Sequence, residues 1–273
     1  MRYSRQEVFI GKKAQRTLQK SLVTIVGCGG TGSVAAQYLA RAGVNLRLID
    51  RDIVEQSNLG RQLFTEDDMG KPKASVLKEH LEQANGEITI EAIDDDLNQT
   101  NIYDHFADSS MIIDGTDNMM TRFLINDFCM KKRIPFTYAA AIKSEGLFTL
   151  IVPGKTPCLQ CFVPSTSINK LDTCETVGVL GPVVGVIGSL SAAEAINFLT
   201  GKRTVMGNLF HANIDRNTFQ TIALEQKKEC KACSGVYEFL DRRSSQVSML
   251  CGNVYQYIFD KEINLRTIAS GIE

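Results

Sequence analysis

Two pairs of cysteines with the same spacing stand out among the residues that could do chemistry. They lie in Cys158-Leu-Gln-Cys161 and Cys230-Lys-Ala-Cys233. C-x-x-C spacing lets two thiolates reach one metal ion, and two such pairs are typical of a closed, tetrahedral zinc site. The four cysteines therefore predict one structural Zn²⁺ that joins distant segments and leaves no open position for catalysis. The alternative is four unrelated thiols.

A glycine-rich segment, Gly27-Cys28-Gly29-Gly30-Thr31-Gly32, matches the pattern G-x-G-x-x-G. It follows an apolar run and precedes a helical stretch, so that backbone amides and a helix N-terminus can approach a phosphate there. Asp50 ends the next apolar run, where a carboxylate can accept hydrogen bonds from ribose hydroxyls. Taken alone, the motif favours NAD, because dehydrogenases and flavoproteins use it too.

Two basic residues and a further acid reverse that preference. Arg61 and Lys73 follow the ribose position, where a dehydrogenase has no need for concentrated positive charge. A triphosphate does need it, because nucleotidyl transfer depends on cations at the phosphate oxygens and on a carboxylate that holds Mg²⁺. Asp117 follows an expected sheet strand, at the same edge as the glycine turn, and is the candidate carboxylate. Alternatively, Arg61 and Lys73 are solvated charges and Asp117 caps a helix.

The elements that must position these residues alternate along the first half of the chain. A strand at Leu22–Val26, a helix at 33–42 and a strand at 46–49 form a βαβ unit. The alternation continues with helices near 73–84, 99–107 and 118–131 and strands near 88–93, 110–114 and 135–140. This order predicts an α/β, Rossmann-like fold, with a mostly parallel sheet and helices on both faces.

The second half has a different pattern. After Gly146 we expect antiparallel strands at 147–152, 205–211 and 218–224, a loop at 173–184, and an apolar helix at 183–200. The stretch 177–199 is long enough for a membrane span, but Pro182, four glycines and Glu194 interrupt it, which indicates a core helix. One more strand is expected at 246–251. We expect a nucleotide-binding half at about 20–145, a metal-containing half at about 146–234, and a short extension at 235–273.

Composition narrows the class of protein. The 273 residues are 44% apolar, enough for a sizeable core, and the net charge of −1 favours neither nucleic acid nor an anionic membrane surface. Eight cysteines, four of them in metal-type pairs, accompany an N-terminus with no apolar signal region. We therefore expect a soluble cytoplasmic protein. Cys28, Cys129 and Cys251 are expected to act as small buried residues.

Seven ordered motifs resemble the ThiF/MoeB/HesA family of ubiquitin-activating-like adenylyltransferases. They are RYSRQ at 2–6, GCGGTG at 27–32, DRD at 50–52, NLGRQ at 58–62, KPK at 71–73, GTDN at 115–118, and the two C-x-x-C pairs. The resemblance covers about residues 2–234. It implies a homodimer that uses MgATP to adenylate the C-terminal Gly-Gly of a ubiquitin-like sulfur carrier, ThiS-like or MoaD-like, in thiamin or molybdenum cofactor biosynthesis, with release of pyrophosphate.

The family pattern also implies residue roles. Asp50 would bind the ribose, Asn58, Arg61 and Lys73 the phosphates, and Asp117 the magnesium. The remaining nucleotide-binding positions are Gly27, Gly29, Gly30, Gly32 and Gln62. Arg5 resembles an arginine finger that reaches the triphosphate of the partner subunit. Cys174 matches a crossover-loop cysteine that takes the activated carboxyl as a thioester or an acyl persulfide; similar proteins keep this cysteine without clearly depending on it, so its role stays open.

The chain departs from the family pattern in two places. Gly60 replaces a common glutamine, and no rhodanese segment follows, so sulfur is expected from a separate donor such as a cysteine desulfurase or rhodanese. Cys174 and its sequence context favour a ThiS-like carrier slightly over a MoaD-like one. Two other functions remain open: an NAD-dependent oxidoreductase, and a non-catalytic, zinc-stabilised binder of a ubiquitin-like protein.

Overall fold

The computed structural model describes residues 2–164, 177–202, 204–241, 247–250 and 254–257. The chain divides into two compact units, Met1–Leu240 and Asp241–Glu273. In the second unit, β9 (Val247–Leu250) and β10 (Val254–Tyr257) pair as an antiparallel ribbon. The sequence predicts β9 but not β10. The first unit contains the candidate site.

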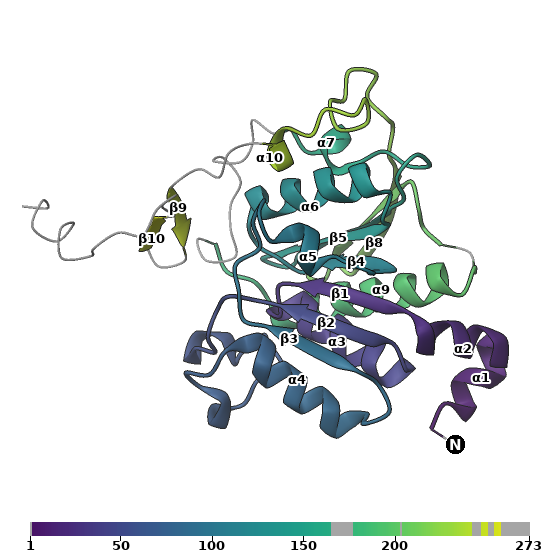
Figure 1. Ribbon diagram of the computed structural model, residues 1–273, viewed down its shortest axis with the longest axis vertical. Coiled ribbons are helices and arrows are strands. Elements are labelled where there is room, and N and C mark those ends of the chain that lie inside the picture. The colour runs from purple at the N-terminus through teal and green to yellow at the C-terminus, as the bar shows by residue number, and fades with distance from the viewer. Residues whose placement is uncertain (1, 165–176, 203, 242–246, 251–253, 258–273) are drawn as a thin grey trace, which may run out of the picture. The chain divides into compact units, whose positions relative to one another are not determined.

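An eight-stranded sheet organises the first unit, in the order β3-β2-β1-β4-β5-β6-β7-β8 (Figure 1). Its strands are β1 (Leu22–Val26), β2 (Asn45–Ile49), β3 (Ile90–Ile93), β4 (Met111–Asp114), β5 (Phe136–Ile142), β6 (Glu145–Ile151), β7 (Asn208–Asn213) and β8 (Thr218–Ala223). The first five strands pair in parallel, and the sheet continues antiparallel from β6 onward. The predicted change from a parallel to an antiparallel half is confirmed.

Helices cover both faces of this sheet (Figure 1). On one face lie α3 (Gly30–Ala42), α4 (Lys73–Ala84) and α9 (Gly181–Leu199), and on the other lie α5 (Ile102–His105) and α6 (Met119–Lys132). Successive residues of β1 face opposite cores: Val23 and Ile25 pack on the α3 side, and Val26 packs on the α6 side. This period of two is the pattern of a strand buried on both faces.

Helix α9 is the apolar segment with the length and composition of a membrane span. It packs against α3, β5 and β6. Gly188 permits the close approach to α3, because a Cβ there would lie 2.6 Å from the Thr31 carbonyl oxygen. The helix begins at Gly181, inside the predicted loop at 173–184, because Pro182 is tolerated in a first helical turn. The predicted core helix is therefore present and starts slightly earlier.

Some elements differ from the sequence expectation. Two N-terminal helices, α1 (Ser4–Ile10) and α2 (Lys12–Lys20), are not predicted, because α2 is mostly polar and buries only Gln15 and Leu18. The predicted helix at 99–107 is only α5, and β7 starts three residues late, after the left-handed Gly207. The short helices are η1 (Gln56–Asn58), η2 (Glu66–Asp68), α7 (Leu159–Phe162) and α10 (Glu238–Asp241). Cys174 and Cys251 lie outside the described residues.

Candidate active site

The glycine turn lies at the carboxyl end of β1, where backbone segments approach too closely for side chains. A Cβ on Gly32 would lie 1.8 Å from the Gly27 carbonyl oxygen, and a Cβ on Gly27 would lie 2.7 Å from that of Gly115. Gly27 also has a φ of +85°, which favours glycine. Helix α3 starts at once, and its N-cap, Gly29, has no side chain to occupy the free amides. These amides and the helix dipole favour a phosphate here.

The loop at 58–62 lies beside this turn. A Cβ on Gly30 would lie 3.5 Å from the Arg61 carbonyl oxygen, and one on Gly29 would lie 3.5 Å from Nε2 of Gln62. Oε1 of Gln62 is buried without a hydrogen-bond partner among the described residues. The buried Asn58 shapes the loop itself, because its Oδ1 accepts from the Glu55 amide at 3.0 Å. The structure thus brings the backbone of Arg61 and the side chain of Gln62 to the glycine turn, with Asn58 in the same loop. Nη1 of Arg61 donates to the Ser57 carbonyl oxygen at 2.6 Å.

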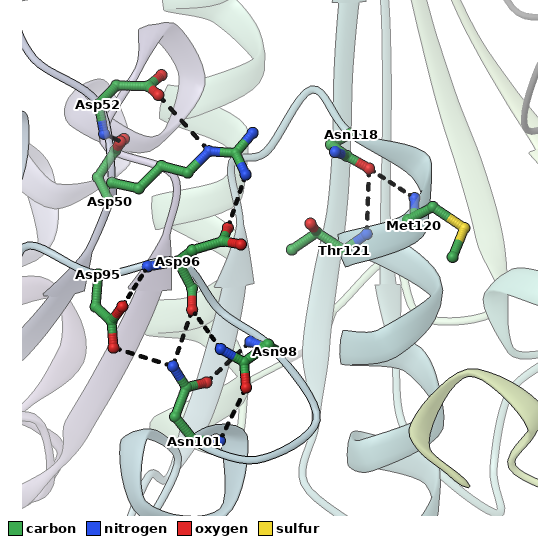
Figure 2. Close-up of polar contacts among 10 residues, drawn as sticks. Asp50, Asp52, Asp95, Asp96, Asn98, Asn101, Asn118, Met120 and Thr121 are labelled. Atoms are coloured by element: carbon green, nitrogen blue, oxygen red, sulfur yellow. Dashed lines mark hydrogen bonds and ion pairs between the residues drawn. The ribbon is translucent and has the colours of Figure 1, made fainter. Parts of the chain in front are cut away.

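Asp50, at the end of β2, joins that strand to the glycine turn. Its buried carboxylate accepts a hydrogen bond from the Cys28 amide at 2.6 Å. It also accepts one from the Asp52 amide at 2.8 Å (Figure 2). Burial raises the pKa of Asp50 to about 6, against the opposing effect of Lys73. The carboxylate lies at the same edge of the sheet as the glycine turn, the position at which the sequence predicts a ribose.

Lys73, the first residue of α4, is buried, and its Nζ donates to Oδ2 of Asp52 at 2.9 Å. Burial alone would lower the pKa of Lys73, but the Asp50 and Asp52 carboxylates outweigh it and raise that pKa. The charge of Asp117 acts in the same direction. The ammonium is therefore held charged at this edge. Sequence reasoning missed the role of Asp52 as its partner, although the DRD segment was the available signal.

Asp117 lies just beyond β4, and its side chain is exposed. The neighbouring Asn118 caps α6: its Oδ1 accepts from the Met120 and Thr121 amides (Figure 2). The helix-capping alternative therefore belongs to Asn118. Within the described residues, the Asp117 carboxylate accepts no hydrogen bond. An exposed carboxylate whose charge reaches the Lys73 ammonium is a ligand of the type that fits Mg²⁺.

Acidic and amide side chains continue around this edge of the sheet (Figure 2). Arg51 joins Asp52, at 3.8 Å, to Asp96, at 2.9 Å. Asn98 and Asn101 both donate to the Asp96 carbonyl oxygen and so close the loop after β3. These contacts fix the edge at which Asp50 and Lys73 lie. Sequence reasoning did not single out the 94–101 loop.

Arg5 lies at the amino ends of the parallel strands, whereas the glycine turn lies at their carboxyl ends. Helix α2 ends directly before β1, so that α1 and α2 lie at the amino end of that strand (Figure 1). Gln6, next to Arg5, donates to the carbonyl oxygen of Ala42, the last residue of α3. The Arg5 side chain itself is exposed. The structure therefore does not bring Arg5 to the glycine turn of its own chain.

The acid strength of Asp50 predicts a pH dependence of nucleotide binding. With a pKa of about 6, Asp50 is ionised at pH 7.5 and mostly protonated at pH 5. A protonated carboxyl accepts ribose hydroxyls less well, so ATP affinity should fall about tenfold between these pH values. Calorimetric titrations with ATP across this range measure the effect. Asp50→Asn should bind ATP weakly at every pH. If the ATP affinity of this variant still falls with pH as in the wild type, another group is responsible for the pH dependence.

The four paired cysteines come together in space, as their spacing predicts. Their sulfur atoms lie within 4.8 Å of one another, and the Cys158–Cys230 and Cys161–Cys233 separations are 3.4 and 3.6 Å. Thiolates around a tetrahedral Zn²⁺ with bonds of about 2.3 Å lie about 3.8 Å apart. Burial raises the pKa of Cys158 above the ordinary thiol range, so a cation would have to compensate its thiolate. The cluster fits a metal ion with four sulfur ligands.

Helix α6 supports the loops that hold these cysteines. Oδ1 of Asn126 accepts from the Leu159 amide at 2.9 Å. The carboxylate of the buried Asp127 accepts from Nε2 of Gln160 and from the Phe239 amide, both at 2.8 Å. The same helix begins beside Asp117. One rigid element thus connects the candidate magnesium ligand to the cysteine cluster.

The sequence is similar to those of known adenylyltransferases. The chain is 40% identical to the sulfur carrier protein ThiS adenylyltransferase of Escherichia coli, over 86% of this chain and 95% of that protein. It is 35% identical to the ThiS adenylyltransferase of Bacillus subtilis, over 98% and 83% of the two chains. The adenylyltransferase and sulfurtransferase MOCS3 of Aedes aegypti is 36% identical over 85% of this chain, which spans about half, 55%, of that protein.

Solved structures agree with these sequence relatives. The structure of E. coli MccB with ATP superposes with a TM-score of 0.75, at 26% identity, over 86% of this chain and 75% of that one. Fold and site together define a nucleotide-binding α/β enzyme of the adenylyltransferase class. The ThiF family pattern matches residues 3–233, and the chain belongs to the ThiF family. Family membership favours adenylyl transfer over the oxidoreductase and the non-catalytic binder.

Proposed function

We propose that the protein adenylates the C-terminal Gly-Gly carboxylate of a ubiquitin-like sulfur carrier. A carboxylate oxygen attacks the α-phosphorus of ATP, the bond from that phosphorus to the bridging oxygen breaks, and pyrophosphate leaves with the electron pair. The product is a carrier acyl-adenylate. This step needs no side-chain nucleophile. Two anions must meet, so positioning and charge neutralisation carry the catalysis.

The arrangement at the carboxyl edge supports this reaction and carries the proposal. The free amides at the start of α3 would bind the phosphates, Arg61 and the Lys73 ammonium would supply positive charge, and the Asp50 carboxylate would accept hydrogen bonds from the ribose hydroxyls. Asp117 would hold Mg²⁺, which neutralises charge that develops on the phosphate oxygens.

The relatives support a sulfur carrier as the acyl substrate. Two of them are named for ThiS, and MOCS3 is named as both an adenylyltransferase and a sulfurtransferase. The E. coli ThiS enzyme matches along nearly its whole length, 95%, and this favours a ThiS-like carrier over a MoaD-like one. The pathway would then be thiamin rather than molybdenum cofactor biosynthesis, with sulfur from a separate donor of the cysteine desulfurase or rhodanese type.

Intact-mass spectrometry of the carrier tests this function. After incubation with MgATP and the protein, a ThiS-like carrier should gain the mass of an adenylyl group, which is AMP less one water. Inorganic pyrophosphatase should increase the yield by removing the other product. A carrier that lacks its last two glycines is the matched control and should gain nothing. Binding of the carrier without any AMP adduct would indicate a non-catalytic binder instead.

We further propose that the active protein is a homodimer and that Arg5 completes the partner's site. The position of Arg5 at the amino edge of its own sheet supports this, because the glycine turn lies at the other edge. A guanidinium that enters from a second chain would stabilise the triphosphate charge during transfer.

Mixing two inactive variants tests the role of Arg5. Arg5→Ala and Asp117→Ala should each be nearly inactive alone. Random exchange of subunits makes half of the dimers mixed, and each mixed dimer has one intact site, so activity should return to about a quarter of wild type. Adenylation of the carrier measures the recovery. No recovery after verified subunit exchange would mean that Arg5 does not act across the interface.

The remaining sequence assignments are also proposals. We propose Zn²⁺ as the metal of the cysteine cluster, because four thiolates in tetrahedral arrangement select it over oxygen-preferring cations. Cys174 lies outside the described residues. We propose that its thiolate attacks the acyl carbon of the carrier adenylate after the first step, so that the acyl–phosphate bond breaks, AMP leaves and the carrier is held as a thioester. A carrier adduct that hydroxylamine releases, and that Cys174→Ala lacks, would be its signature.

A further inference from the structure

Arg122, in the first turn of α6, is the centre of a buried hydrogen-bond network to which the proposed function assigns no role. Its side chain is 9% exposed. Nε donates to the Thr116 carbonyl oxygen at 3.1 Å, and Nη2 donates to the same oxygen and, at 2.9 Å, to that of Ala139. The guanidinium also lies over the ring of Tyr138, 5.0 Å from its centre. One planar group therefore joins the end of β4, the middle of β5 and the start of α6.

Asp114 forms the other half of this network. Its carboxylate is fully buried at the end of β4. Oδ1 accepts from the Thr116 amide at 3.0 Å and from the Thr116 hydroxyl at 2.7 Å. Oδ2 has no hydrogen-bond partner among the described residues and lies 3.8 Å from Nε of Arg122. Thr116 is thus held on its amide, hydroxyl and carbonyl sides at once.

Thr116 is the residue directly before Asp117. Gly115, on its other side, is fixed against the glycine turn, because its amide donates to the Val26 carbonyl oxygen at 2.8 Å and a Cβ there would lie 2.7 Å from the Gly27 carbonyl oxygen. Asp117 itself makes no side-chain hydrogen bond within the described part of the chain. Its place relative to the phosphate-binding turn therefore depends on the backbone at 115–116.

We propose that Arg122 is a positioning residue that fixes Asp117 for Mg²⁺ through the Thr116 carbonyl oxygen. The proposal rests on the proposed function for the role of Asp117. A plain stabilising ion pair would need only the contact with Asp114. The guanidinium also donates two hydrogen bonds to the Thr116 carbonyl oxygen, and this contact fixes the orientation of the peptide bond that leads to Asp117.

Arg122→Lys separates the two possibilities. Lysine keeps the positive charge beside Asp114, but one ammonium cannot reproduce the planar fork that holds both carbonyl oxygens. The Mg²⁺ concentration that half-saturates ATP binding, followed by calorimetry, should rise about tenfold, because small displacements of a ligand are costly. Arg133→Lys, an exposed arginine at the other end of α6, is the matched control and should behave as wild type.

A double-mutant cycle shows whether Arg122 acts through Asp117. In an Asp117→Asn background, Arg122→Lys should shift the Mg²⁺ requirement less than about threefold, because the residue it positions no longer binds the ion. An equal shift in both backgrounds, or a shift below about threefold in the native background, overturns the proposal. If Arg122→Lys does not fold, the neutral pair Asp114→Asn with Arg122→Gln replaces it in the cycle, since it leaves no lone buried charge.

These measurements do not depend on the carrier. If the wild-type protein binds MgATP but adenylates no carrier, the proposed function fails while the Mg²⁺ titration still decides the role of Arg122. If the carrier is adenylated and Arg122→Lys changes only the melting temperature, the role of Arg122 fails while the proposed function stands.

Discussion

Replacing Asp117 with alanine should lower carrier adenylation about 10³-fold, while ATP still binds. The expected loss is large because the carboxylate is the candidate Mg²⁺ ligand, and the charge that the ion neutralises develops mainly in the transition state. The side chain is exposed and makes no hydrogen bond to the described residues, so folding should be unaffected. Single-turnover adenylation rates, together with thermal melting, measure the two effects separately.

Asp67→Asn provides the control for this experiment. Asp67 is an exposed acid in η2, and its replacement by asparagine removes one negative charge outside the candidate site. It should adenylate the carrier at the wild-type rate. If both variants lose the same adenylation activity, the change in net charge accounts for the result, and not the loss of a metal ligand. If Asp117→Ala keeps full activity, Asp117 is not the magnesium ligand.

Replacing Cys230 with serine should abolish stoichiometric metal binding and lower the melting temperature by 10 °C or more, roughly, because metal binding is coupled to folding. Cys230 is buried, and its sulfur lies 3.4 Å from that of Cys158. Loss of one of the four ligands weakens the hold on the cation, which leaves the thiolates of the buried Cys158 and Cys161 and the half-buried Cys233 without a positive charge to balance them. Elemental analysis of the wild-type protein should find about one zinc per chain.

Cys129→Ala tests whether the effect belongs to the cluster. Cys129 is also a buried thiol, but it lies on α6 within the core. This variant should keep one metal per chain and lose little stability. A Cys230→Ser protein that folds like wild type, or wild-type protein that contains no metal when purified without chelator, would contradict the structural role of the ion.

Much of this architecture follows from the sequence because the signals are local. The period-two strands and the glycine turn define the βαβ unit, and Leu22–Val26 is β1 as predicted. The parallel order follows from alternation, since each helix must return the chain to the same edge. The C-x-x-C spacing likewise predicts the cluster, because two ligands in one turn need only a second pair to complete a tetrahedron.

The rest depends on contacts that no local pattern contains. Helix α2 has nine residues, of which only Gln15 and Leu18 are buried, so its stability comes from packing and not from an apolar stripe. Asp52 becomes the partner of Lys73 only because α4 starts beside the end of β2. Arg122 meets Asp114 through the fold of the intervening turn. Polar networks of this kind are specified by tertiary structure.

The central claim is that this site activates the carboxyl terminus of a sulfur carrier with ATP. Exchange of radiolabelled pyrophosphate into ATP tests it most directly, because exchange requires the reversible formation of an acyl-adenylate. We predict exchange that depends on both Mg²⁺ and an intact ThiS-like carrier. Exchange that is absent with every ubiquitin-like carrier, or that persists when the carrier lacks its terminal Gly-Gly, would contradict the account.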